Sequence, residues 1–413
     1  MQVYNSALRR ARYENSEKSR RAPLPILLWA VSVFTLISCF GGEGFLGFQA
    51  AGFGWVVPFV LALFVLISRM DNGVRFPFYI WLPWILLVMI HLSVADTPHA
   101  LQRSVMMLSP IAVGMAVSKF SAGEGEIEAF VRLCRYTAAG LFAIVVMKTG
   151  IARTGTMPMA TALAAEAITS LLFAVFFATR YALWGGKAIV WWAAMIMIPL
   201  LAVTRSAILV AGLSLPLTFA PLNIWKRALI ISLMAIIGVS LFYSERIQRK
   251  MFYSGHGTFA DISLDNPDFR MTGRNTILKV MKAKLSESPW FGHGANASEP
   301  LVRSITYGLT HPHDDWLRLM YDYGYVGTFV FAACMSAQIL HAFKRARRST
   351  GEIGVLFYVG AASFIPFVML MFTDNIIMYA AYYGNFQFTI LGMAYAAQGA
   401  EDDVKAVSPR RFA

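Results

Sequence analysis

Charged side chains are scarce in this chain, since Asp, Glu, Lys and Arg make up only 14% of its 413 residues. Soluble domains carry about 25% charged residues. Hydrophobic residues reach 57%, and the mean hydropathy is +0.56. This balance excludes a chain of two or three soluble domains and predicts an all-α polytopic membrane protein.

Cysteine is also rare, and the chain has neither an internal repeat nor a low-complexity tract. Cys39, Cys134 and Cys334 lie in or beside apolar runs without paired spacing, so we expect no disulfide framework and no metal site from them. The run 24–40 is followed by no convincing small-residue cleavage site. It is therefore expected to remain as a first transmembrane helix rather than to be cleaved as a signal peptide.

Apolar runs of spanning length predict about twelve transmembrane helices, because a helix needs about 20 apolar residues to cross the bilayer. The runs lie near 24–40, 51–68, 77–94, 104–118, 128–147, 158–178, 188–203, 206–221, 228–244, 324–342, 354–372 and 377–397. The two runs around Thr204 are together too long for one span, which favours a tight hairpin there.

Lysine and arginine gather in every second loop. One side receives Arg9, Arg10, Arg12, Lys18, Arg20, Arg21, Arg69, Arg75, Lys119, Arg132, Arg135, Arg180, Lys187, Lys226, Arg227, Lys344, Arg345, Arg347, Arg348, Arg410 and Arg411. The short loops of the other side hold Arg103, Lys148, Arg153 and Arg205. By the positive-inside rule both termini are cytoplasmic. The net charge of +13 is thus explained by topology, and we expect no nucleic-acid partner.

The resulting organisation is a cytoplasmic tail (1–22), transmembrane helices 1–9 (23–244), a large helical periplasmic loop (245–323), transmembrane helices 10–12 (324–398) and a second cytoplasmic tail (399–413). Two helices are expected within the loop. The first runs from Gly273 to about Ser286 with Thr272 as its N-cap. The second begins near His311, has Pro312 in its first turn, and runs into Gly324.

The segment THPHDDWLRLMYDYGYVG is the most informative part of the chain. In the first turn of the predicted helix, the helix dipole would disfavour a protonated His313, and a neutral histidine can act as a general base. The negative charges of Asp314 and Asp315 would favour a protonated His313, so the protonation state of His313 stays open. The alternative is an ordinary histidine on a capped surface helix. No second ligand cluster accompanies these residues, so neither a metal nor a cofactor is predicted.

Three arginines on the outer side are candidates for binding an anion. Arg205 lies in PLLAVTRSAILVAGL, where an arginine at membrane depth costs about 2.5–3.5 kcal/mol on insertion scales. Arg274 shares the apolar stripe of its predicted helix, and Arg153 lies on the same side of the membrane. Guanidinium groups can hold phosphate oxygens in pairs. The alternatives are a snorkelling side chain for Arg205, a structural ion pair for Arg274 and a solvated loop for Arg153.

Three parts of the chain resemble the O-antigen ligase/polymerase superfamily of bacterial envelope glycan enzymes. They are Thr204-Arg205-Ser206 after a hairpin, Thr272-Gly273-Arg274 followed by SPWFGHG, and HDDWLRLMYDYGYVG from His313 to Gly327. In the last segment His313, Leu317, Asp322, Gly324 and Gly327 keep the family spacing. Asp314 stands where the family usually has Asn, and Asp322 where it often has Glu.

The resemblance implies a GT-C-like enzyme of the bacterial inner membrane that works at the periplasmic face. It would transfer a glycan from undecaprenyl diphosphate to an acceptor hydroxyl of a glycan or lipid-linked glycan, without a metal and with inversion. His313 would be the base. Arg205 and Arg274 would stabilise the leaving diphosphate, and Arg153 and Asp314 would contribute to substrate binding.

Two alternatives to a polysaccharide polymerase stay open. One is an O-antigen ligase that uses lipid A–core as the acceptor, because the shared motifs do not separate it from a polymerase. The other is a transporter of lipid-linked glycan or solute, although such proteins usually show matched halves and a site near the bilayer midplane. The sequence also leaves open whether a chain-length regulator binds and which sugars are moved.

Overall fold

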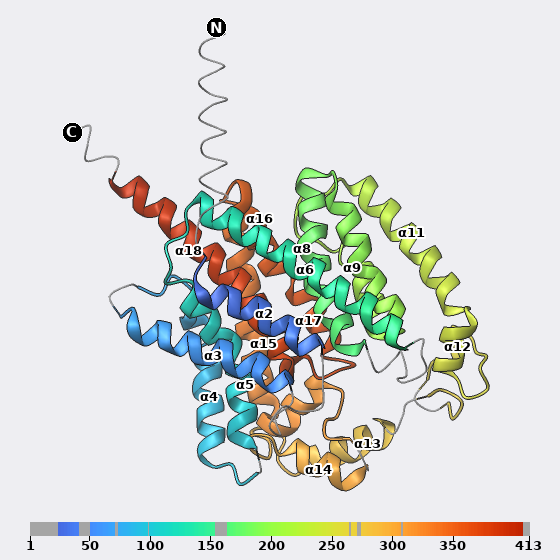
Figure 1. The fold of residues 1–413 in the computed structure, drawn as a ribbon. Coiled ribbons are helices and arrows are strands. Elements are labelled where there is room, and N and C mark those ends of the chain that lie inside the picture. Colours follow the sequence, from blue (N-terminus) through green and yellow to red (C-terminus); the bar gives the residue numbers. More distant parts are fainter. Residues whose placement is uncertain are drawn as a thin grey trace.

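The computed structural model describes residues 24–40, 50–70, 73–97, 99–152, 163–263, 266–270, 274–306 and 309–407. Over these residues the protein is a bundle of helices without a named strand, and Phe252 and Phe269 form an isolated β-bridge (Figure 1). The α-helices are α2 (Ile26–Phe40), α3 (Ala50–Ser68), α4 (Leu82–Ser93), α5 (Ala100–Val117), α6 (Glu124–Ala152), α8 (Ala164–Trp184), α9 (Ala188–Ala202), α10 (Arg205–Leu213), α11 (Ile224–Phe242), α12 (Glu245–Met251), α13 (Arg274–Leu285), α14 (Ser298–Ile305), α15 (Asp315–Ala346), α16 (Gly351–Ala362), α17 (Phe364–Leu370) and α18 (Asn385–Val407). Short turns of other helix types are η1 (Phe78–Ile80), η2 (Phe259–Asp261), η3 (Ile376–Met378) and η4 (Ala380–Gly384).

Six helical stretches of the described chain are long and apolar enough to cross a membrane. They are Ala100–Val117, Glu124–Gly150, Ala164–Trp184, Ile224–Phe242, Asp315–Ala346 and Gly351–Leu370. Four shorter apolar helices accompany them: Ile26–Phe40, Gly52–Ser68, Leu82–Ser93 and Ala188–Ala202. The all-α membrane fold is confirmed, whereas the number of twelve crossings remains a prediction.

The predicted run 206–221 is wrong as a full span, because its helix α10 ends at Leu213. Pro216 and Pro221 lie in the remainder, and proline removes a backbone donor and clashes with the preceding turn. The hairpin at Thr204 is confirmed. Helix α9 ends at Ala202, Val203 adopts a left-handed φ of 52°, and α10 packs back against α9.

Helices α5, α8, α16 and α18 lie at the centre, and α2, α3, α9 and α15 pack around them. Every residue of α8 from Glu166 to Arg180 is buried. Glu166 pairs there with Lys148 of α6 at 2.7 Å, a buried structural pair. Helix α11 differs, since it lies at one side of the bundle (Figure 1) and exposes apolar side chains such as Trp225 and Ile236. In a bilayer these side chains would face lipid.

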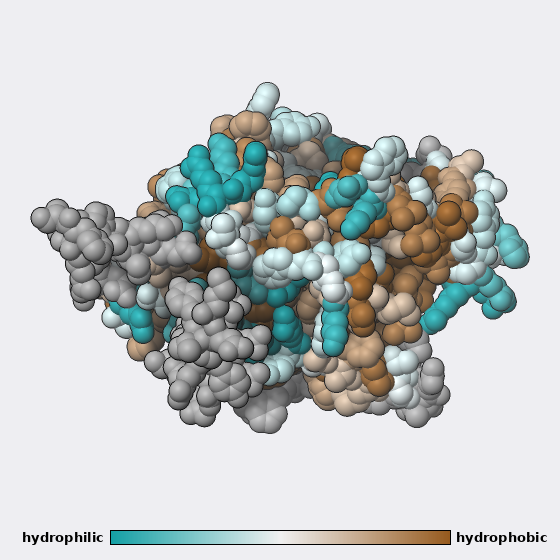
Figure 2. Space-filling view, turned by 90° about the horizontal axis from the view of Figure 1, so that it is seen from above, coloured by the Kyte–Doolittle hydropathy of each residue, from teal (hydrophilic) through white to brown (hydrophobic). Residues whose placement is uncertain are grey.

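Helices α12, α13 and α14, from the segment predicted to be a periplasmic loop, lie at the end of the molecule opposite the C-terminal end of α18 (Figure 1). Helix α13 buries Ile277, Met281 and Leu285, and the first two form a small core with Val302 and Leu317. Figure 2 views the opposite end of the molecule, where hydrophilic side chains lie in several groups and hydrophobic ones extend along the flank.

Helix α15 is interrupted at Gly324, whose φ is 68° and ψ −174°, as the predicted end of a helix at this residue requires. The loop Pro289–Gly294 fills the break. Pro289 O accepts Tyr325 N–H at 2.8 Å, Trp290 O accepts Val326 N–H at 3.1 Å, and Gly294 N–H donates to Asp322 O at 3.0 Å. The SPWFGHG segment therefore satisfies backbone groups that the break would otherwise leave unpaired.

We expect Gly324→Ala to destabilise the protein by more than about 2 kcal/mol, the range of a left-handed non-glycine residue plus a backbone clash. A Cβ at Gly324 would lie 2.2 Å from Trp290 O, a backbone atom that cannot move aside. Thermal unfolding in detergent measures the effect. Gly238→Ala in α11 is the matched control, because nothing lies within 4 Å of its Cβ position. A Gly324→Ala protein that melts with the wild type would contradict the assigned backbone conformation.

Candidate active site

His313 lies before helix α15, so the prediction that it belongs to the first turn of a helix beginning near His311 is wrong. The helix begins at Asp315, and the Asp314 side chain accepts Leu317 N–H at 2.9 Å as the N-cap. Aspartate is among the strongest N-cap residues, and this capping outweighs the preference of Pro312 for a first turn. His313 is left with a φ of 55°, in the left-handed region.

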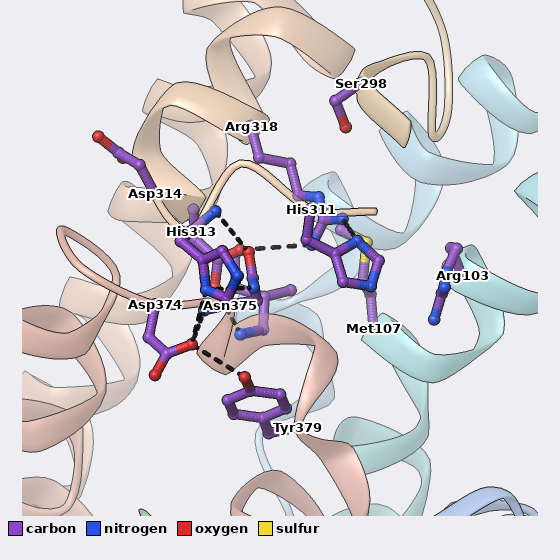
Figure 3. A network of polar contacts seen from close by, with 12 residues as sticks. Arg103, Met107, Ser298, His311, His313, Asp314, Arg318, Asp374, Asn375 and Tyr379 are labelled. Atoms are coloured by element: carbon purple, nitrogen blue, oxygen red, sulfur yellow. Dashed lines mark hydrogen bonds and ion pairs between the residues drawn. The ribbon is translucent and has the colours of Figure 1, made fainter. Parts of the chain in front are cut away.

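The loop after α17 holds His313 in that conformation. Asn375 Oδ1 accepts the His313 backbone N–H at 3.0 Å. The ring atom Nδ1 lies 3.1 Å from Asn375 Nδ2 and 3.4 Å from Asp374 Oδ1 (Figure 3). Both side-chain contacts involve Nδ1. Among the described residues Nε2 is therefore the ring nitrogen left for a reacting group.

Asp374 is placed to keep the His313 ring oriented. Its Oδ1 accepts the Tyr379 hydroxyl at 2.9 Å and the Asn375 backbone N–H at 2.8 Å. Burial alone would raise the pKa of Asp374, but the hydrogen bonds from His313, Asn375 and Tyr379 outweigh burial and lower it. An ionised carboxylate at Nδ1 favours a proton on that nitrogen, whereas Asn375 Nδ2 can only donate and needs Nδ1 unprotonated. The Nε2 lone pair is free in the tautomer that Asp374 favours.

The first turn of α15 is fastened to the same loop. Asp315 N–H donates to Met371 O at 2.7 Å, and Asp315 Oδ2 accepts Ile377 N–H at 2.8 Å. The Asp314 carboxyl points away from His313 (Figure 3), and its burial raises its pKa. In the structure it caps the helix, and the substrate contact expected from the sequence stays a prediction.

Arg274, the first residue of α13, reaches this loop as well. Its Nη1 donates to Thr373 O at 3.1 Å, one residue before Asp374. Arg205, the first residue of α10, donates from Nη2 to Arg270 O at 3.5 Å, and its guanidinium lies 5.7 Å from the Phe269 ring centroid. The charges of Arg205 and Arg274 lie close enough to repel each other. The fold therefore gathers the two predicted arginines beside the His313 loop.

Two further cations, which the sequence did not single out, join these arginines. Lys250 of α12 donates from Nζ to Val203 O, and its pKa is lowered by burial and then by the charges of Arg205 and Arg246. The guanidinium of Arg270 lies 4.7 Å from the centre of the Tyr253 ring. Both belong to the polar segment 245–323, where many residues are polar and a single cation does not indicate a site. Only the fold brings the charge of Lys250 and the backbone carbonyl of Arg270 to Arg205.

We call Arg205, Lys250, Arg270 and Arg274 the cationic cluster. Three of its members donate to backbone carbonyls, and none forms an ion pair with a carboxylate of the described chain. Arg205 Nη1 and Arg270 Nε are buried without a hydrogen-bond partner there. A buried charge without a counter-charge is costly. The cluster is therefore suited to an anionic ligand that brings the missing acceptors.

Arg153 and the predicted N-cap Thr272 fall outside the described residues. Lys148, a further cation of the outer side, is occupied by Glu166 and Cys39 O. In the described part of the chain, no three His, Cys, Asp or Glu side chains converge in a way that could hold a metal ion.

Comparison with known proteins gives one family match, to the O-antigen ligase model, over residues 188–332. A search of curated proteins finds no match. The matched segment contains α9 to α14 and the first part of α15, and with them the cationic cluster and His313. Members of this family are membrane enzymes that transfer glycans. The match over residues 188–332 supports the resemblance of this membrane protein to the O-antigen ligase/polymerase superfamily.

Proposed function

We propose that the protein is a glycosyltransferase that moves an undecaprenyl-diphosphate-linked glycan onto an acceptor hydroxyl, as a polysaccharide polymerase. The observation that carries this proposal is that Arg274 and His313 both contact residues 373–375. Thr373 O holds Arg274 of the cationic cluster, and Asp374 and Asn375 hold His313. This arrangement supports a base and an anion site that lie side by side.

In the proposed reaction His313 Nε2 removes the proton of the acceptor hydroxyl as the oxygen attacks the anomeric carbon. The imidazolium that forms carries a proton on Nδ1, which the Asp374 carboxylate stabilises at 3.4 Å. Attack occurs on the face opposite the leaving group, so the configuration at the anomeric carbon inverts. Transfer of the proton through Nε2 contributes about 10²- to 10⁴-fold to the rate.

The leaving undecaprenyl diphosphate gains negative charge as its bond to the sugar breaks. Arg205 and Arg274 are proposed to stabilise this charge, with Lys250 and Arg270 as further contacts. The unpartnered Arg205 Nη1 and Arg270 Nε supply donors that point to no protein acceptor in the described chain. The developing charge would thus be met by fixed cations, without a metal ion being required. Asp314 and Arg153 remain proposed substrate contacts.

The proposed orientation puts both termini in the cytoplasm and the site at the periplasmic face of the bacterial inner membrane. The distribution of Lys and Arg supports it, and so does the separation of α12–α14 from the C-terminal end of α18 (Figure 1). Cysteine labelling distinguishes the two faces, with Ser254→Cys and Ser349→Cys as the reporting positions. Labelling of Ser254→Cys, and not of Ser349→Cys, by an impermeant maleimide is expected in intact cells whose outer membrane is permeabilised.

The central experiment is transfer by the purified protein in detergent with EDTA, using undecaprenyl diphosphate that carries a single repeat unit. A polymerase should yield lipid-linked products of increasing length. A ligase should act only when lipid A–core is added, and the family match to O-antigen ligase makes this the second candidate. Loss of transfer in EDTA, restored by a divalent cation, would contradict the metal-independent mechanism. No transfer to either acceptor would contradict the proposed function.

Lipid extracts of cells separate the same two candidates. Cells without a polymerase should accumulate lipid-linked single repeat units, because initiation continues while elongation stops. Cells without a ligase should accumulate long lipid-linked chains. The extracts are compared with those of cells in which the wild-type gene is restored.

We expect Asp374→Asn to lower turnover by about 10²-fold or more, since the amide cannot stabilise the imidazolium as an anion does. The lowered pKa of Asp374 means that its contact with His313 adds stability above the ordinary carboxyl range, and that this stability is lost as the pH falls through the lowered pKa. Melting temperature against pH should therefore decline less steeply in acid for Asp374→Asn than for the wild type. The exposed Asp96→Asn is the control. Parallel profiles would contradict the link to Asp374.

A further inference from the structure

Arg318 is a buried arginine, 1% exposed, that the proposed mechanism does not use. Its neighbours on α15 are carboxylates. Asp315 lies one turn before it, with Oδ1 3.5 Å from Arg318 Nη1, and Asp322 lies one turn after it. In the described chain its hydrogen bond runs instead from Nη2 to His311 Nδ1 at 2.7 Å, while Nε and Nη1 have no hydrogen-bond partner (Figure 3). A guanidinium flanked by two carboxylates thus makes its hydrogen bond to a histidine.

His311 is a permanent acceptor for this bond. Burial, followed by the positive charges of Arg318 and Arg103, lowers the pKa of His311 to about 3. The ring is therefore neutral at any physiological pH, with its proton on Nε2 and the lone pair of Nδ1 toward Arg318. The hydrogen bond from Arg318 to His311 therefore persists over the pH range in which the protein works.

The hydrogen bond between Arg318 and His311 restrains the turn that carries His313. Only Pro312 separates the two histidines, and the fixed φ of proline transmits the position of His311 to His313. His313 is in the left-handed region, a conformation that persists only when the surroundings hold it. Asn375 holds it from one side by accepting its backbone N–H. His311 and Arg318 are the corresponding support on the other side.

We infer that Arg318 and His311 are positioning residues that fix the turn His311–His313, so that His313 Nε2 points at the acceptor hydroxyl. This inference rests on the proposed role of His313 as the base. The competing role for Arg318 is purely structural, a partner for Asp315 and Asp322 inside α15. Replacing both Arg318 and His311 by apolar residues separates the two roles. A purely structural role predicts that stability and turnover recover together, whereas a positioning role predicts that stability recovers and turnover does not.

The test compares His311→Leu, Arg318→Met, the double variant and His311→Asn, each as the full-length protein. A single substitution leaves a buried polar partner unpaired and lowers the melting temperature, whereas the double variant removes both partners and should recover most of the loss. The carboxyls of Asp315 and Asp322 can then be protonated rather than remain charged. In His311→Asn, Oδ1 can take the place of Nδ1 as acceptor.

Turnover should fall about 10²-fold in His311→Leu and stay low in the double variant, because a displacement of about 1 Å at a catalytic group has this effect. The KM for the lipid-linked donor should not change, since the cationic cluster is untouched. His311→Asn should keep most of the turnover. A double variant that recovers stability and turnover together would overturn the inference, and so would normal turnover in His311→Leu.

A second measurement separates this inference from the proposed function. The wild type and the double variant are compared by cryo-electron microscopy with a bound antibody fragment. A shifted or disordered His311–His313 turn in the double variant supports the positioning role, and an unchanged turn overturns it. Absence of transfer by the wild type would reject the proposed function, and the structural comparison would still decide whether Arg318 fixes the turn.

Discussion

His313→Asn should reduce glycan transfer by about 10³-fold while leaving donor binding unchanged, because loss of a general base removes about 10² to 10⁴ from the rate. Asparagine suits the test for a conformational reason. His313 has a φ of 55°, and asparagine is one of the few non-glycine residues that tolerate the left-handed region. The variant should thus keep the turn and lose the Nε2 atom that would accept the proton.

His99→Asn is the matched control for this variant. His99 precedes α5 with a φ of 62°, is exposed, and makes no side-chain capping bond. The same substitution is thereby tested in the same backbone conformation, away from the loop 373–375. Transfer rates at saturating donor give the effect on turnover, and equilibrium binding of labelled donor shows whether the site is intact. A His313→Asn protein that keeps more than about a tenth of the rate would disprove the assignment of the base.

Most of the helical fold follows from the apolar runs alone. In a bilayer each crossing must satisfy its own backbone hydrogen bonds, so a long apolar run has almost no alternative to a helix. The constraint weakens where the runs are short or contain proline. The run 206–221 is apolar enough to predict a span, but it contains Pro216 and Pro221 and its helix stops at Leu213.

The first residue of α15 could not be predicted from the sequence, for a different reason. Pro312 and Asp314 each carry a helix-start signal, and the sequence gives no means of ranking them. In the structure the Asp314 carboxyl accepts Leu317 N–H, and Met371 O accepts Asp315 N–H. The second of these contacts comes from a loop more than fifty residues away. The start of α15 therefore depends on the contact with Met371 as well as on capping by Asp314, and the sequence does not show that contact.

The partners of His313 and Arg205 could be predicted only in part. Asp374 and Asn375 lie in the short stretch between the last two predicted spans, and an ionisable residue at such a place is a functional candidate. The segment MFTDNIIMY thus carries a signal from which this pair could have been found. Lys250 and Arg270 give no comparable signal, because they lie among polar residues. Their approach to Arg205 depends on how the segment 245–270 folds over the start of α10.

Arg205→Met should lower turnover by about 10²- to 10³-fold, the usual effect of losing one donor that stabilises a developing anion. We expect the same substitution to leave the melting temperature unchanged or to raise it. Arg205 Nη1 is buried without a partner in the described chain, and its charge repels those of Arg274 and Lys250. Removing an uncompensated buried charge relieves that repulsion.

The opposite signs of these two effects identify a binding cluster, because a structural arginine would lose stability and activity together. Inorganic pyrophosphate should raise the melting temperature of the wild type, since a ligand that binds only the folded protein stabilises it. The rise should shrink in Arg205→Met and in Arg274→Met. Arg205→Lys should restore part of the binding but little of the turnover, because an ammonium cannot hold two phosphate oxygens as a guanidinium does. Arg249→Met, at an exposed cation that pairs with Glu245, is the control. A fall in the melting temperature of Arg205→Met, with pyrophosphate binding intact, would assign Arg205 to the fold rather than to the leaving group.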